Sequence, residues 1–168
     1  MEWARERLAG AAIAEMPAGT TVTRFDRLHE LPFFSEDDEA AENWPDVVRD
    51  FRDAVSSADA VLLVTPEYNG AVPALLSNAI DIASRPHRED AIIGKPVAVI
   101  GASASPGAAQ LAREQAVRSL RRAGAHPLDD HIGIGQGYQR PQLVDADTRA
   151  RLRTLLDQLV NGASAQAA

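Results

Sequence analysis

The sequence predicts an α/β protein with a parallel sheet, because strand patterns and amphipathic helix patterns alternate along the chain. Two short, largely apolar runs bounded by turn residues, 60–65 and 97–100, are the clearest strands. A strand that is apolar on both faces is typical of a parallel sheet covered by helices on both sides. The predicted architecture is therefore a three-layer α/β sandwich.

The first third of the chain predicts two helices and one strand. Residues 3–15 are apolar at helical spacing, and residues 20–25 alternate β-branched with other side chains, which favours a strand. The acidic segment 35–42 is interpreted as a solvated loop. Pro45 then opens a helix, and the apolar face of that helix comprises Val47, Val48, Phe51 and Val55.

The remainder continues the alternation. A helix at 73–84 follows the strand at 60–65, and a helix at 107–123 follows the strand at 97–100. A weaker strand is expected within 126–134. Asp145 is a suitable N-cap for a final helix, 146–160, whose inward side chains are expected to be Leu152, Leu155, Leu156 and Leu159.

Composition narrows the class of protein. The 168 residues suit one domain, assigned to 1–162, with a disordered tail at 163–168. A net charge of −7 argues against nucleic-acid binding, and no apolar run is long enough to span a membrane. The chain has no cysteine and no secretory pattern at its start, which fits a reducing cytoplasm. Redox chemistry would then have to come from a bound cofactor.

The most informative motif is the loop that ends the strand at 60–65. Its sequence is Thr65-Pro66-Glu67-Tyr68-Asn69-Gly70, followed by Val72-Pro73 and, on the next helix, Asn78-Ala79-Ile80-Asp81. A loop at the carboxyl end of a parallel strand lies where open α/β sheets bind ligands. These residues at these offsets resemble the NADPH-dependent FMN reductase family, whose members have a flavodoxin-like fold.

The resemblance implies that FMN and NADPH are the cofactors and that the electron acceptor is a flavin, quinone, azo dye or metal oxyanion such as chromate. It also implies a homodimer or homotetramer that assembles through the helix at 73–84. Backbone amides of the loop would face the pyrimidine edge of the isoalloxazine, where charge builds on reduction. The cofactor-binding residues expected on this basis are Pro66, Glu67, Tyr68, Asn69 and Gly70, with Ser103 from the next strand's loop.

Two residues of this loop keep alternative interpretations. Glu67 either contacts the ligand or forms an ion pair with a neighbouring subunit. Tyr68 either stacks on the flavin ring or packs against protein. No side chain is assigned as catalytic, because hydride transfer through a flavin needs none.

The chain departs from the family pattern in two places. Gly107-Ala108-Ala109 stands where the family has paired glycines. The family's first central strand and its Gly/Ser/Arg phosphate loop are also expected to be missing, because residues 3–9 already read as the helix that follows them. Either a start codon is placed late in a true reductase, or the chain is a non-catalytic interaction or remnant domain that has lost FMN binding. A flavodoxin-type electron carrier is a third possibility.

Other candidate signals favour ordinary structural roles. Gly133 to Gly137 is interpreted as a flexible loop rather than a phosphate loop. Asn78 and Asp81 are assigned to helix packing and surface pairing. None of the four histidines has carboxylates at metal-ligand spacing, and the acidic residues 36–39 lack the pattern of a calcium loop.

Overall fold

A parallel ladder between β1 (Val61–Pro66) and β2 (Pro96–Ala102) forms the centre of the computed structural model. The structure describes residues 2–40, 43–86, 90–135 and 145–166. Every residue of β2 is buried, whereas half of β1 is only partly buried. The apolar run at 97–100 therefore lies in a strand covered on both faces, as predicted.

Two short strands complete the sheet beside β2. β3 (His126–Pro127) pairs with the beginning of β2, and β4 (Ile132–Ile134) pairs with its end, both in parallel. The order is β1-β2-β3, with β4 also on β2. The weak strand predicted within 126–134 is thus real but interrupted, and Pro127 lacks the N–H that a continuous ladder would need.

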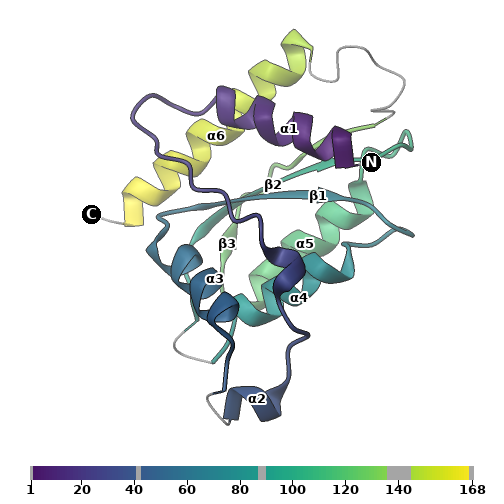
Figure 1. Ribbon diagram of the computed structural model, residues 1–168. Coiled ribbons are helices and arrows are strands. Elements are labelled where there is room, and N and C mark those ends of the chain that lie inside the picture. The colour runs from purple at the N-terminus through teal and green to yellow at the C-terminus, as the bar shows by residue number, and fades with distance from the viewer. Residues whose placement is uncertain (1, 41–42, 87–89, 136–144, 167–168) are drawn as a thin grey trace.

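Helices cover both faces of this sheet (Figure 1). Alternate residues of β2 point to opposite layers: Val97 and Val99 belong to one apolar cluster, and Ala98 and Ile100 to the other. The helices of the second cluster are α1 (Glu2–Ala14) and α6 (Ala146–Gln166). Those of the first are α3 (Asp46–Ser57), α4 (Ala74–Ala83) and α5 (Gln110–Arg122). The three-layer, flavodoxin-like architecture is confirmed.

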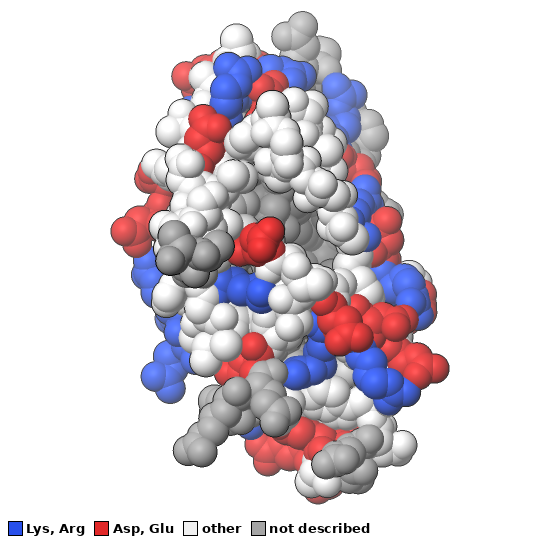
Figure 2. Space-filling view, turned by 90° about the vertical axis from the view of Figure 1, so that its left-hand side faces the viewer, with Lys and Arg blue, Asp and Glu red and all other residues white. Residues whose placement is uncertain are grey.

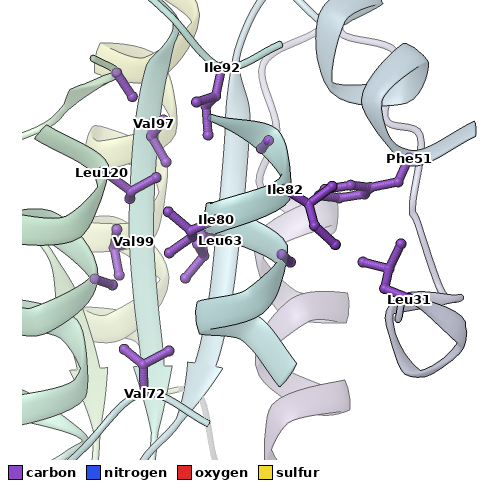
Figure 3. Close-up of a cluster of buried hydrophobic side chains, with 14 of the residues drawn as sticks. Leu31, Phe51, Leu63, Val72, Ile80, Ile82, Ile92, Val97, Val99 and Leu120 are labelled. Atoms are coloured by element: carbon purple, nitrogen blue, oxygen red, sulfur yellow. The ribbon is translucent and has the colours of Figure 1, made fainter. Parts of the chain in front are cut away.

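The first cluster joins the sheet to α4 and α5 (Figure 3). Ile80 of α4 lies against Leu63 of β1, and Leu120 of α5 lies beside Val97 and Val99 of β2. Ile80 is 6% exposed and Leu120 is fully buried. Truncating a side chain in this environment typically costs about 2–5 kcal/mol. These contacts hold α4 and α5 against the sheet, and both helices begin at the sheet edge that carries the predicted site.

The strand predicted for residues 20–25 does not form. Residues 20–27 have neither strand nor helix structure between α1 and the short 3₁₀ helix Leu28–Glu30. Alternating β-branched residues favour an extended backbone, but a strand also needs a partner for its N–H and C=O groups. None of the described strands pairs with this segment. The prediction was therefore wrong, because hydrogen bonding to a neighbouring strand decides whether a strand forms, and the β-propensity of the residues alone does not.

Three other boundaries differ from expectation. A short exposed helix, α2 (Glu36–Ala40), forms inside the segment predicted as an acidic loop. α5 begins at Gln110 instead of 107, for a reason given below. α6 includes residues 163–166, which the sequence assigned to a disordered tail, while residues 167–168 lie outside the described part.

Charges of both signs are mixed over the face on which the strands begin, around a hollow lined mainly by uncharged residues (Figure 2). This face shows no continuous basic stripe of the kind that tracks a phosphate backbone. In the described part of the chain, no helix combines the length and the apolar character that crossing a bilayer requires.

Glu15, directly after α1, bonds to two arginines of α6, and the stability that this contact adds should decrease at acidic pH. Hydrogen bonds from Arg153 and then Arg149 lower the pKa of Glu15 below its ordinary value of 4.5. A carboxylate with a lowered folded-state pKa stabilises the fold above its unfolded pKa, and that contribution is lost as the pH falls through the folded value. We expect Glu15→Gln to lower the melting temperature at pH 7, and the difference from wild type to shrink below about pH 4.5. A difference independent of pH would contradict this role.

Candidate functional site

The strand β1 ends in a tight turn at the carboxyl edge of the sheet. The Tyr68 amide donates to the Ala71 carbonyl at 3.1 Å, and the Ala71 amide donates back to Tyr68 at 3.0 Å. The two residues between them have positive φ angles, 52° at Asn69 and 74° at Gly70. Two positive φ angles define a type I′ turn, for which Asn-Gly is the favoured pair. The local sequence thus dictates this turn.

The tip of the turn presents two amide donors. Within the described residues, no group accepts a hydrogen bond from the amide of Asn69 or Gly70. Asn69 is exposed, and the neighbouring Tyr68 side chain is 50% exposed. Two unpaired N–H groups beside an aromatic ring can bind a flat ligand with acceptor atoms along one edge. The residues present therefore fit the pyrimidine edge of a flavin.

Glu67 links this turn to α5. Its carboxylate accepts a hydrogen bond of 3.1 Å from the Ala112 amide, in the first turn of that helix. A helix N-terminus has unpaired N–H groups and a partial positive charge, so a carboxylate is favourable there. The structure thus gives Glu67 a partner inside its own chain. Its predicted ligand contact stays a prediction.

The second loop of the edge, residues 103–109, follows β2. Ser103 is 3% exposed, and its hydroxyl accepts a hydrogen bond of 3.1 Å from the Ala109 amide. That hydroxyl also lies 3.1 Å from the Ser105 carbonyl, to which it can donate. Ser103 therefore shapes this loop. Its predicted contact with a cofactor also stays a prediction.

The backbone of this loop is strained at its end. Ala108 and Ala109 have φ angles of 55° and 58°, in the left-handed region that non-glycine residues avoid. Both residues belong to the Gly107-Ala108-Ala109 stretch, where the sequence departs from the pattern of the family it resembles. The left-handed residues explain why α5 begins only at Gln110, although the apolar pattern starts earlier.

The sheet register brings the two loops together. Pro66 at the end of β1 pairs with Ala102 at the end of β2, so the residues that follow each strand leave the sheet side by side. Leu111 of α5 also lies close to Gly70, since a Cβ on that glycine would be 3.2 Å from the leucine methyl. The structure therefore gathers Pro66 to Gly70 and Ser103 at one edge, as the sequence predicted.

Beneath the second loop lies a buried arginine that sequence reasoning did not identify. Arg113 is 7% exposed, and burial lowers its pKa. Its Nε donates to the Ala108 carbonyl at 3.1 Å, and its Nη1 donates to the His131 carbonyl at 2.9 Å. The feature of the sequence that could have identified this arginine is its position on the predicted helix. It lies on the same apolar side as residues that are buried: Ala109, Ala112, Ala116 and Val117.

His131 completes the surroundings of Arg113. Burial holds the pKa of His131 below its ordinary value, and the charge of Arg113 acts in the same direction. A neutral imidazole with its proton on Nε2 can accept a hydrogen bond at Nδ1, and Nη1 of Arg113 lies at that atom. The pair is therefore compatible with one positive charge, on the arginine.

Close packing explains Gly133 and Gly135 of the Gly133 to Gly137 motif, which superficially resembled a phosphate loop. A Cβ on Gly133 would collide with the Ala108 carbonyl oxygen, and one on Gly135 would lie 2.8 Å from the Pro106 carbonyl oxygen. Gly133 belongs to β4, so the flexible-loop interpretation is wrong there. The glycines let β4 pack closely against the loop at 103–109. Gly137 lies outside the described residues.

Other features lie away from this edge. A mainly apolar crevice lies near the far end of α4, lined by Pro32, Phe33, Phe34, Ser35, Asp38, Trp44, Pro45, Val48 and Ile82. The described histidines, aspartates and glutamates form no cluster of three or more that could hold a metal ion. His87 lies outside the described residues.

Comparisons with known proteins agree with this geometry. A family model described as NADPH-dependent FMN reductase matches residues 2–139. A quinone reductase of Pseudomonas putida is 44% identical over 102 residues, which are 61% of this chain and 53% of that protein. An NADPH:quinone oxidoreductase of Arabidopsis thaliana is 35% identical over 137 residues, 75% of this chain and 66% of that protein. The chain thus spans about half the length of the Pseudomonas putida quinone reductases it matches.

Among solved structures, the flavoenzyme NAD(P)H:(acceptor) oxidoreductase FerB from Paracoccus denitrificans superposes with a TM-score of 0.81 and 27% identity. The superposition covers 95% of this chain and 89% of that chain. The similarity therefore includes both faces of the sheet and the edge that carries the two loops.

Proposed function

This chain belongs to the NADPH-dependent FMN reductase family, and we propose that it binds FMN at the carboxyl edge of its sheet and uses NAD(P)H to reduce small-molecule acceptors. The observation that carries the proposal is the open Asn69-Gly70 turn beside the 103–109 loop. Its two amides, which have no partner among the residues that the structure describes, offer a site for an electron-accepting heterocycle. A quinone is the favoured acceptor, since several relatives are named quinone reductases.

The protein's own contribution to such chemistry is placement and electrostatics. A bound flavin supplies hydride acceptance and onward electron transfer. The amides of Asn69 and Gly70 would donate to the ring edge on which negative charge accumulates. Fixed backbone dipoles stabilise such charge without needing to reorganise. The reciprocal hydrogen bonds between Tyr68 and Ala71 hold these donors in place.

FMN binding tests this proposal. We expect the purified chain to quench FMN fluorescence on titration, and the loaded protein to oxidise NADPH when a quinone is added. Gly70→Val should weaken FMN binding about tenfold or more, because a β-branched residue is strained at φ 74° and its Cβ would press on Leu111. Gly10→Ala is the control, since nothing lies within 4 Å of a Cβ there.

The alternative function is a non-catalytic interaction domain. One observation favours it: the Ser103 hydroxyl and the Ala109 amide already bond to each other, so neither is open to a ligand in this arrangement. A wild-type chain that folds but neither quenches FMN nor oxidises NADPH would support this alternative over the enzyme. A chain that binds FMN without oxidising NADPH would point to an electron carrier.

The same edge supports a proposal about assembly into a homodimer or homotetramer. Three large side chains are exposed at this edge: Tyr68 in the turn after β1, Leu75 at the start of α4 and Leu111 at the start of α5, with exposed fractions of 50%, 40% and 56%. Burying them against a second copy would remove apolar surface from water. Light scattering should show a dimer or tetramer for wild type and a smaller species for Leu111→Glu. A wild-type monomer at micromolar concentration would contradict the proposal.

A further inference from the structure

We infer that Arg113 is a positioning residue, whose guanidinium holds the 103–109 loop in its strained shape beside the Asn69-Gly70 turn. The inference rests on the proposed function only in taking this loop as one wall of the FMN site. It concerns how the wall is kept in place, which can be measured with or without FMN.

The loop needs to be held. Ala108 and Ala109 are consecutive left-handed residues, a conformation that costs free energy for any residue with a Cβ. Such strain persists only where the surroundings over-determine the backbone. Without ties, Ala108 and Ala109 would relax toward negative φ angles and move the amide groups of the loop.

Arg113 supplies ties in two directions. Its Nε bonds to the carbonyl of Ala108, the first left-handed residue, and its Nη1 bonds to the carbonyl of His131 just before β4. The planar guanidinium fixes the angle between these bonds, which a flexible ammonium cannot do. The side chain therefore clamps the end of the loop to the sheet.

The neighbouring strands leave room for this side chain. A Cβ on Gly101 would lie 2.9 Å from Cδ of Arg113, and one on Gly133 would lie 2.6 Å from its Nη2. Both strands that flank the guanidinium therefore carry the one residue type that tolerates it. Burying a charge is costly unless it is well bonded, so an apolar side chain would be the cheaper way to fill this space. The hydrogen bond to the strained loop explains why an arginine is used here: it holds the loop in place.

A rescue experiment tests the clamp. In the apoprotein, we expect Arg113→Met to raise amide hydrogen exchange of the 103–112 segment about tenfold or more, and to weaken FMN binding by a similar factor. Ala108→Gly removes the strain at the residue that Arg113 holds. The double variant Arg113→Met/Ala108→Gly should therefore recover part of both losses, while Ala109 stays left-handed. Arg118→Met is the matched control, since Arg118 is exposed on the same helix.

The outcomes separate this inference from its alternatives. Equal losses with and without Ala108→Gly would overturn it, because Arg113 would then be an ordinary core residue. If Arg113→Met does not fold, Arg113→Lys is used in its place, alone and together with Ala108→Gly. The expected result is the same: the double variant shows slower hydrogen exchange and tighter FMN binding than the single Arg113 variant. If wild type fails to bind FMN, the proposed function fails, while the exchange measurement still decides the role of Arg113.

Discussion

Gly133→Ala is expected to lower the free energy of unfolding by about 2–3 kcal/mol, the upper part of the range for an overpacked interior site. The added methyl would meet the Ala108 carbonyl oxygen and lie 2.6–2.7 Å from the guanidinium of Arg113. A backbone carbonyl cannot rotate away as a flexible side chain can, so either β4 or the 103–109 loop must shift. Urea or thermal unfolding measures the loss, which corresponds to roughly 4–12 °C in melting temperature.

A second glycine variant provides the control. Gly10 is exposed in α1 with nothing within 4 Å of a Cβ, so Gly10→Ala should stabilise the protein by about 0.5–1 kcal/mol. The opposite signs follow from the surroundings alone, because the chemical change is the same. A stability of Gly133→Ala equal to wild type would show that the close packing of β4 on the loop is not as described.

Asn78→Leu is expected to cost about 2–4 kcal/mol although the two side chains are similar in size. Asn78 is 7% exposed, its Oδ1 accepts from the Phe34 amide at 2.8 Å, and its Nδ2 donates to the Pro32 carbonyl at 2.9 Å. Leucine would leave both backbone groups without their partner. This side chain is the polar tie between α4 and the segment that leads to α2.

Two measurements check the Asn78 prediction. Unfolding gives the global loss, and hydrogen exchange at the Phe34 amide should rise more than exchange in β2. Asn161→Leu, at an exposed position of α6, should change stability by no more than about 0.5 kcal/mol. A similar small effect for Asn78→Leu would mean that water replaces the amide group at little cost.

Most elements of the fold could be predicted from local patterns. The apolar runs at 60–65 and 97–100 became β1 and β2, and the helices opened by Pro45 and Pro73 begin one residue later, at Asp46 and Ala74. Asp145 caps α6 because its carboxylate accepts a hydrogen bond of 2.8 Å from the Thr148 amide. These features depend on periodicity and capping, which a sequence records directly.

The Asn69-Gly70 turn could also be predicted, because its type follows from two residues that tolerate positive φ angles. Arg113 could not be placed in the same way. It lies 18 residues before His131, and the space for it is made by glycines on two strands. Only the folded chain shows that Gly133, Ala108 and Arg113 meet.

By itself the sequence determined the layers, the exposed turn at the end of β1 and the family, since each depends on residues close together in the chain. The tertiary structure alone decided that residues 20–27 form no strand, that Glu67 bonds to α5 and that the second loop rests on Arg113. These outcomes depend on which backbone groups and side chains find partners far along the chain. Hydrogen bonding and close packing are settled by distances in space, which local pattern does not encode.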